Sequence, residues 1–375
     1  MQGEWQAAGA HADRAATEAP GSVEARLLQA EARLRAGHHA EAAALAQALL
    51  VDAPWSGDAA ALEVEARLAL GARGVTSHAV DRALTVDPDH PRALAARAYL
   101  GLQRDAAGLV TSPAQRREAA RQAAERALRL DPAQPLAHAV LAELGDAAGD
   151  VVVALVAAGR ARQHGAHLPD VHVLRGRLRG RHQGDVGALD DFDQALRLRP
   201  ADARALANRA GLLLARGYVP AALAAADEAL RVDPNLAEAF LHRARAHLKA
   251  RPRDRQRAYD DLNQALRRAP GLVEAWLHRA VVFHDLAMHA EAVADVDRAL
   301  ALLAPGAARR TDLLLVRGRS LLGLARWVEA EAALAEVERQ GRTSHRDEER
   351  LHLLRERLAG RLDDAALREA LAATR

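Results

Sequence analysis

The stretch PAALAAADEALRVDPNLAEAFLHRARAHLKA, residues 220–250, contains the features that decide the fold. A segment rich in alanine and leucine runs to Val232, and a second one of the same character runs from Ala237 to Ala250. Both carry apolar residues at helical spacing. Because proline fixes φ and lacks an N–H, Pro234 ends the first helix cleanly and the next begins a few residues later. The stretch therefore predicts two helices joined by a short turn.

The phrase that ends at Pro234 recurs along the chain. Its members end at Pro20, Pro54, Pro88, Pro132, Pro200, Pro234, Pro270 and Pro305. Most neighbours are 34 to 36 residues apart, and the gap from Pro132 to Pro200 equals two periods of 34. A period of this length, with a short break inside each repeat, indicates a solenoid of stacked helix pairs.

Each repeat also has the same interior. In residues 203–236 a bulky residue, three small residues and a proline follow in order: Leu206, Ala210, Ala222, Ala229 and Pro234. The pattern resembles the tetratricopeptide-repeat (TPR) family, in which small residues allow the two helices of a repeat to approach closely. Arg209, Arg243 and Arg279 depart from it, because the family often has leucine there. The resemblance covers essentially the whole chain.

The resemblance implies an all-α fold, a right-handed α-solenoid of about nine helix-turn-helix repeats. We expect a partial repeat with only its second helix at 1–20, the array at 21–342 and a capping helix pair at 343–375. The partial repeat is either a minimal cap or the result of excision from a longer protein, and we favour excision. A ten-residue insertion at 108–117 predicts a loop, which is either a tolerated surface loop or a binding edge.

Composition excludes several classes of function. The chain has 52 basic and 50 acidic residues, so it lacks the strong positive field of a general nucleic-acid binder. It has no cysteine, and no apolar run approaches the roughly 20 residues that span a bilayer. Nucleotide-binding and nucleophile motifs are missing as well. We therefore expect a cytoplasmic, non-catalytic protein without a cofactor or metal, and with neither nucleic acid nor membrane as its partner.

Two kinds of polar cluster invite a chemical role. His38–His39 and His164-x-x-His167 suggest metal ligands, but we interpret them as surface histidines at the breaks between helices. The acidic phrases LDDFDQAL (189–196) and YDDLNQAL (259–266) suggest paired carboxylates. We interpret these as a solvated convex face with local ion pairs.

The TPR resemblance implies that the first helix of each repeat lines a concave groove. Transferring the groove positions of the family predicts a partner-binding set of Arg177, Arg181, Arg204, Asn208, Leu241, Arg245, Leu277, His284, Leu315 and Arg319. The N-terminal half contributes instead an acidic wall of Glu31, Glu65, Tyr99 and Glu143. Because arginine binds carboxylates with two parallel hydrogen bonds, the arginine-rich half predicts a ligand with acidic and apolar residues. Alternatively, these arginines only solubilise the surface.

Two functions follow from these observations. The first is a scaffold that holds a protein or peptide in the concave groove. The second is a regulatory arm of a larger bacterial protein, because arrays with phrases such as AYDDLNQAL and HRA resemble those fused to bacterial Ser/Thr kinases.

Overall fold

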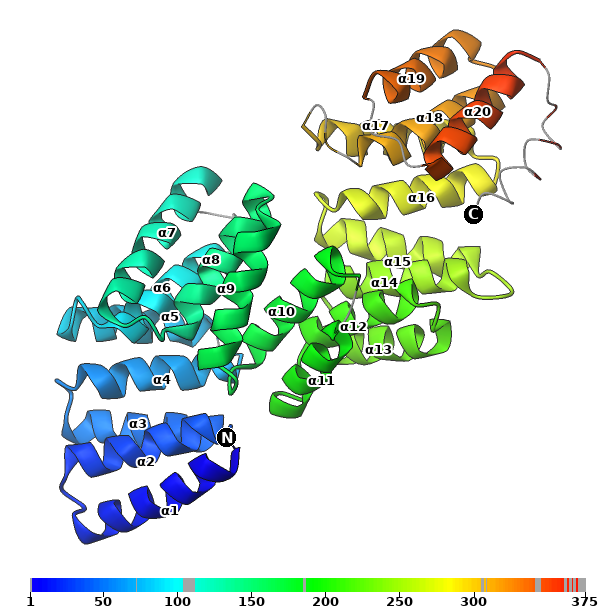
Figure 1. Cartoon of the computed structure of the whole chain (residues 1–375). Helices are drawn as coiled ribbons and strands as arrows, with labels where there is room; N and C mark the ends of the chain where they lie inside the picture. The colour runs from blue at the N-terminus through cyan, green and yellow to red at the C-terminus, as the bar shows by residue number, and fades with distance from the viewer. Residues whose placement is uncertain are drawn as a thin grey trace. The chain divides into compact units, whose positions relative to one another are not determined.

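The computed structural model describes residues 2–71, 73–103, 112–184, 187–304, 307, 309–340, 345–360, 363, 366 and 369. Over these residues the chain forms 20 helices and no strand (Figure 1). It divides into two units, Met1–Leu212 (unit 1) and Leu213–Arg375 (unit 2). This confirms the all-α prediction.

Unit 1 contains eleven complete helices and most of a twelfth. They are α1 (Gln2–Glu18), α2 (Val23–Arg35), α3 (His39–Asp52), α4 (Gly57–Ala69), α5 (Arg73–Val86), α6 (Pro91–Gln103), α7 (Pro113–Leu130), α8 (Pro135–Ala148), α9 (Val151–His164), α10 (Pro169–His182), α11 (Ala188–Leu198) and α12 (Ala203–Ala215). The last three residues of α12 belong to unit 2.

Unit 2 continues with the same kind of helix. Its helices are α13 (Val219–Val232), α14 (Ala237–Lys249), α15 (Arg255–Arg268), α16 (Val273–Asp285), α17 (His289–Ala301), α18 (Arg310–Gly323), α19 (Trp327–Gln340) and α20 (His345–Leu358). Among the described residues, no helix is both long and apolar enough to cross a lipid bilayer.

The helices of each unit form two layers. Consecutive helices pack as antiparallel neighbours, and every second helix also packs on the next but one. In unit 1 the inner series is α2, α4, α6, α8 and α10, and in unit 2 it is α14, α16, α18 and α20 (Figure 1). Within each unit these first helices therefore form one layer, and that of unit 2 positions the candidate site.

The local signals in the sequence correspond to the observed elements. Pro88, Pro200 and Pro234 lie in the turns between helix pairs, as expected. Gly37 and Gly217 occupy the breaks inside repeats with φ near +88° and +84°, a conformation that glycine adopts without strain. The small residues sit in the core, where Ala222, Ala229 and Ala292 are almost fully buried.

The predicted boundaries at 1–20, 21–342 and 343–375 remain predictions. Of the insertion at 108–117, residues 108–111 lie outside the described part of the chain. Ser112 caps α7, and 113–117 belong to the start of that helix. In the C-terminal helix pair, α20 is described, whereas most of its partner at 362–373 lies outside the described residues.

Candidate binding pocket

The inner layer of unit 1 is held by a buried ion-pair network. Glu65 on α4 is only 1% exposed, and its carboxylate forms an ion pair with Arg92 Nε at 2.8 Å and accepts a hydrogen bond from His167 Nε2 at 2.9 Å. Burial by itself raises the pKa of Glu65, but the positive charge of Arg92 and the His167 hydrogen bond outweigh it and hold this pKa well below its usual range. The contact joins α4 to the turn before α10, a separation of 102 residues.

Further long-range hydrogen bonds surround this network. His39 Nε2 donates to the carbonyl oxygen of His167 at 2.8 Å, and Arg35 Nη1 donates to the carbonyl oxygen of His164 at 3.0 Å. Arg199 reaches back to α4, where Nη1 donates to the carbonyl oxygen of Ala69 at 3.0 Å. The prediction of surface histidines is therefore wrong for His39 and His167, which are 4% and 6% exposed. They are buried because the start of α3, which holds His39, packs against the turn before α10, which holds His167.

The predicted acidic wall of unit 1 is largely neutralised within the unit. Glu31 pairs with Arg35 at 2.8 Å and with Arg92 at 3.0 Å, and Tyr99 is buried. Glu143 pairs with Arg177 at 3.4 Å. Because these carboxylates have arginine partners inside the protein, they present little unbalanced charge to a ligand.

The acidic phrases also differ from their interpretation as a solvated face. Asp191 and Asp261 are 2% and 5% exposed. Arg175 Nε donates to Asp191 at 2.9 Å, and Arg243 Nε donates to Asp261 at the same distance. The ion pairs are present as expected, but they are buried because the arginine comes from the first helix of the same repeat.

This pairing explains the arginines that depart from the TPR pattern. Arg243 also donates to Asp227 of the preceding repeat at 2.8 Å, so it links two outer helices. Arg279 makes the equivalent pair of contacts, to Asp295 at 2.7 Å and to Asn263. These arginines connect successive repeats through hydrogen bonds, where leucine would connect them by packing.

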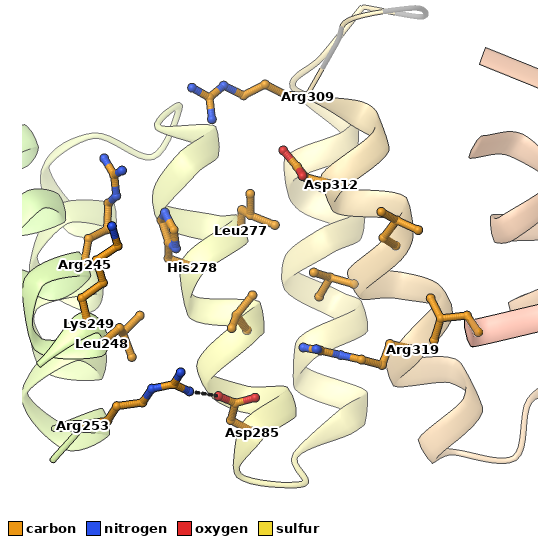
Figure 2. Close-up of a pocket in the computed structure, with 14 residues that line it drawn as sticks. Arg245, Leu248, Lys249, Arg253, Leu277, His278, Asp285, Arg309, Asp312 and Arg319 are labelled. Carbon is orange, nitrogen blue, oxygen red and sulfur yellow. Dashed lines mark ion pairs between the residues drawn. The ribbon is translucent and has the colours of Figure 1, made fainter. Parts of the chain in front are cut away.

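Unit 2 contains a cavity of about 550 Å³ on its inner layer. The lining residues come from α14, α16 and α18 with their adjoining turns, and α20 adds Leu354. Its apolar lining is aliphatic and consists of Leu248, Leu277, Val281, Leu315, Val316 and Leu354. Its polar lining consists of Arg245, Lys249, Arg253, His278, Asp285, Arg309, Asp312 and Arg319 (Figure 2).

The pocket has more cations than carboxylates. Asp285 lies 3.9 Å from Arg253 across one end of the pocket (Figure 2). At the other end Arg309 pairs with Glu274 at 2.9 Å. Lys249 donates to the backbone carbonyl of Leu214 at 3.1 Å.

Arg245 is the cation with the least compensation. Among the described residues it forms no ion pair, and its one hydrogen-bonding contact is to His242 Nδ1 at 3.5 Å. Burial lowers the pKa of Arg245 and the positive charge of Arg309 lowers it further, while the negative charge of Glu274 opposes the shift without reversing it. A guanidinium in this position favours an anion from outside the chain.

Two histidines lie beside these arginines. Burial, together with the charges of Arg245 and Arg309, lowers the pKa of His278 to about 3. Burial and Arg245 lower the pKa of His242 to about 4. Both imidazoles are therefore neutral at pH 7. Within the described part of the chain, no group of three or more His, Asp or Glu side chains could hold a metal ion.

The structure brings together four of the ten predicted binding residues. Arg245, Leu277, Leu315 and Arg319 line the pocket of unit 2. Two others of unit 2 lie outside the lining, because Leu241 is buried in the core and His284 Nδ1 lies 3.1 Å from Ser320 Oγ.

The remaining four predicted residues belong to unit 1. Arg177 and Arg181 pair with Glu143 and Asp146. Asn208 donates from its side chain to the carbonyl oxygen of Arg204 at 2.9 Å.

Sequence reasoning missed several charged residues of the pocket. Lys249 lies one helical turn after Arg245, and this spacing could have revealed it. His278 follows Leu277 directly on α16, and Arg309 lies in the turn before α18. No local pattern marks either as part of the same pocket.

No protein-family model and no curated protein matches the sequence. Among solved structures, the human IFIT1 dimer with m7Gppp-AAAA has a TM-score of 0.54 at 14% identity, covering 94% of this chain and 89% of that one. A tetratricopeptide repeat protein from Parabacteroides merdae has a TM-score of 0.49 at 21% identity, covering 69% and 99%. PilW, a type IV pilus biogenesis factor, has a TM-score of 0.47 at 18% identity, covering 58% and 96%. With its stacked helix pairs and its likeness to the IFIT1 structure, the chain has the fold of a TPR-type repeat protein.

Proposed function

We propose that this chain is a non-catalytic scaffold that binds a peptide segment of a partner protein in the pocket of unit 2. The observation that carries the proposal is the combination of an aliphatic lining with an excess of cations in one cavity on the inner helices, where Arg245 forms no ion pair among the described residues. Such a pocket suits a short segment that places an apolar side chain beside an acidic one.

The apolar part of the site comes from three successive first helices. Leu248, Leu277 and Leu315 lie on α14, α16 and α18 and face the same cavity. An aliphatic side chain that enters this cavity leaves water, which favours binding in proportion to the apolar area buried. The cavity volume of about 550 Å³ is that of a pocket for a few side chains.

The charged part of the site orients the segment. Arg245 has no carboxylate partner among the described residues, so a ligand carboxylate would form a new charge-assisted pair with it. In unit 1, by contrast, Arg35, Arg92 and Arg199 are engaged in or around the network of Glu65. The proposal therefore assigns binding to unit 2.

Peptide display on the full chain tests this proposal. A random peptide library is selected against the protein, and the affinity of a selected peptide is measured by fluorescence anisotropy. We expect selected peptides to combine acidic and aliphatic residues. The double variant Arg245→Glu, Arg319→Glu should lose binding by about tenfold or more, since it turns two attractive charges into repulsive ones.

A matched variant keeps the experiment specific. Arg177→Glu with Arg181→Glu makes the same charge change on α10 of unit 1, and it should leave the affinity unaltered. Equal losses in the two double variants would show a response to overall charge. Selected peptides that lack acidic residues, or that bind both double variants as tightly as the original chain, would contradict the proposal.

A further inference from the structure

The end of the pocket around Arg245 has the chemistry of a phosphate site. Resting on the proposed function, we propose that the anionic group of the bound peptide is a phosphate monoester, held by Arg245, His278 and Arg309. The inference concerns which anion the site selects, and its test separates that choice from peptide binding as such.

The three groups come from separate parts of the inner layer and line the same half of the pocket. Arg245 lies on α14, His278 on α16 and Arg309 in the turn before α18. Figure 2 shows them in the half of the pocket opposite the Arg253–Asp285 pair, and Asp312 lies in the same half. Groups from three directions surround a tetrahedral anion better than they surround a flat carboxylate, because a phosphate presents three terminal oxygens.

The pocket has an excess of positive charge. Five cations line it, against the two carboxylates Asp285 and Asp312. Glu274 lies beside Arg309 at 2.9 Å and Arg255 beside Asp285 at 3.9 Å, so counting these two neighbours leaves the excess at three. A phosphate monoester carries about −1.5 to −2 at pH 7 and compensates more of this excess than one carboxylate, which carries −1.

His278 adds a hydrogen-bond donor that a strong anion would engage. His278 has no hydrogen-bond partner among the described residues, and burial together with the charges of Arg245 and Arg309 keeps it neutral. The other titratable or charged groups around it are His242 on α14, Glu274 on its own helix and Asp312 on α18. A dianion between the two arginines offsets their charges and adds an acceptor beside His278, which raises the pKa of its imidazole and favours a protonated ring that donates to a phosphate oxygen.

The rest of the lining favours a peptide over a nucleic acid. Single-stranded nucleic acids are held by aromatic side chains on which bases stack, along a groove that follows many phosphates. This pocket has aliphatic neighbours and no Phe, Tyr or Trp among its lining residues. It accommodates one anionic group beside apolar side chains.

Three degenerate peptide pools test the inference on the full chain. The pools have nine residues with random flanks, and hold phosphoserine, glutamate or serine at the centre. Affinity is measured by fluorescence anisotropy, and proton uptake by calorimetry in buffers of different ionisation enthalpy. We expect the phosphoserine pool to bind about tenfold more tightly than the glutamate pool, with net proton uptake at pH 7.

Variants assign the effect to named side chains. Arg245→Gln should reduce the affinity for the phosphoserine pool about tenfold. His278→Gln should abolish much of the proton uptake while the helix content by circular dichroism stays the same. Arg231→Gln removes an exposed arginine of α13 outside the pocket and should change neither quantity.

The outcomes separate the two proposals. If the glutamate and phosphoserine pools bind equally and Arg245→Gln weakens both, the phosphate inference is wrong and the peptide site stands. If no pool binds, both proposals are wrong. If Arg231→Gln weakens binding of the phosphoserine pool as much as Arg245→Gln does, the preference for phosphate reflects only the overall charge of the chain. If a 5′-phosphorylated oligonucleotide binds more tightly than the phosphoserine pool, the site belongs to nucleic acid. Either result overturns the inference.

Discussion

The two units are built from the same repeat but differ in whether the charged side chains of their inner helices are paired with each other or face a cavity. In unit 1, Glu65 and Arg92 are buried and satisfy each other, and His167 completes the set from the other end of the unit. In unit 2, Arg245 and His278 face a cavity, with no carboxylate partner for Arg245 among the described residues.

The difference shows how a repeat array separates stability from binding. A polar side chain on an inner helix stabilises the fold when a partner from a distant repeat reaches it, because each buried charge then has its counter-charge. The same kind of side chain becomes a binding group when that partner is missing. The comparison predicts that charge changes destabilise unit 1 and alter ligand binding in unit 2.

The largest effect is expected from Glu65→Gln. The substitution leaves Arg92 buried without its main counter-charge and should lower the stability of unit 1 by about 3–5 kcal/mol. Hydrogen exchange of α4, α6 and the turn before α10, read by mass spectrometry, measures this locally. Glu118→Gln removes an exposed carboxylate of the same unit and is the control. Unchanged protection in Glu65→Gln would mean that the network is not part of the stable fold.

Adding volume to the core tests whether the two units pack their helices in the same way, so that they differ only in the charges of their inner layers. Ala42 in unit 1 and Ala292 in unit 2 are fully buried between helices. Replacing either by leucine should cost about 1–3 kcal/mol, because the core has no room for the added atoms. Denaturant melts compare these two variants with Ala224→Leu, which lies at the surface. A cost confined to one unit would contradict a shared packing register.

The pH dependence of unit 2 should contain a contribution from His278. Its folded pKa is lowered to about 3 from about 6.5, so the folded state favours the neutral ring. The contribution to stability is complete above pH 6.5 and is lost as the pH falls toward 3. Between pH 7 and 6 it amounts to about 0.7 kcal/mol, which His278→Gln should remove.

Hydrogen exchange of α16 at the two pH values provides the measurement. His11, on α1 of unit 1, gives the control His11→Gln, which should leave the pH dependence of α16 unaltered. If His278→Gln and the original chain lose equal protection, His278 is not held neutral by its surroundings.

The smallest effect is expected from Arg245→Gln. Because burial and the charge of Arg309 already disfavour the charge of Arg245, its removal should change stability by less than about 0.5 kcal/mol, in the stabilising direction. The matched change Arg92→Gln in unit 1 should cost several times more, because it leaves Glu65 buried and unpaired. Thermal melts of both variants measure the contrast. A large loss in Arg245→Gln would give this arginine a structural role and remove the distinction between the units.

The local part of the fold was predictable because it depends on residues close together in the chain. The helices, the proline turns and the small residues at Ala222 and Ala292 follow from spacing within one repeat. The arginine of the HRA phrase was visible as a departure from the family. Its role was not, because Asp261 lies 18 residues from Arg243 on another helix.

The candidate site was predictable only in part. The groove positions placed Arg245, Leu277, Leu315 and Arg319 on a common face, and the structure brings them to one pocket. The same reasoning selected Arg177, which is paired with Glu143. It also included Glu65 in an exposed acidic wall, although His167 covers this carboxylate from 102 residues away.

The amino-acid sequence by itself determined the period, the helix pairs and the small residues that let them pack, because these depend on a repeating local pattern. The tertiary structure alone decided which inner charges are neutralised and which face a pocket. Pairing of charges depends on how helices distant in the chain approach each other, and that approach follows from the packing of all the helices of a unit. Two repeats of similar sequence can therefore hold their charges in a closed network in one unit and in a binding pocket in the other.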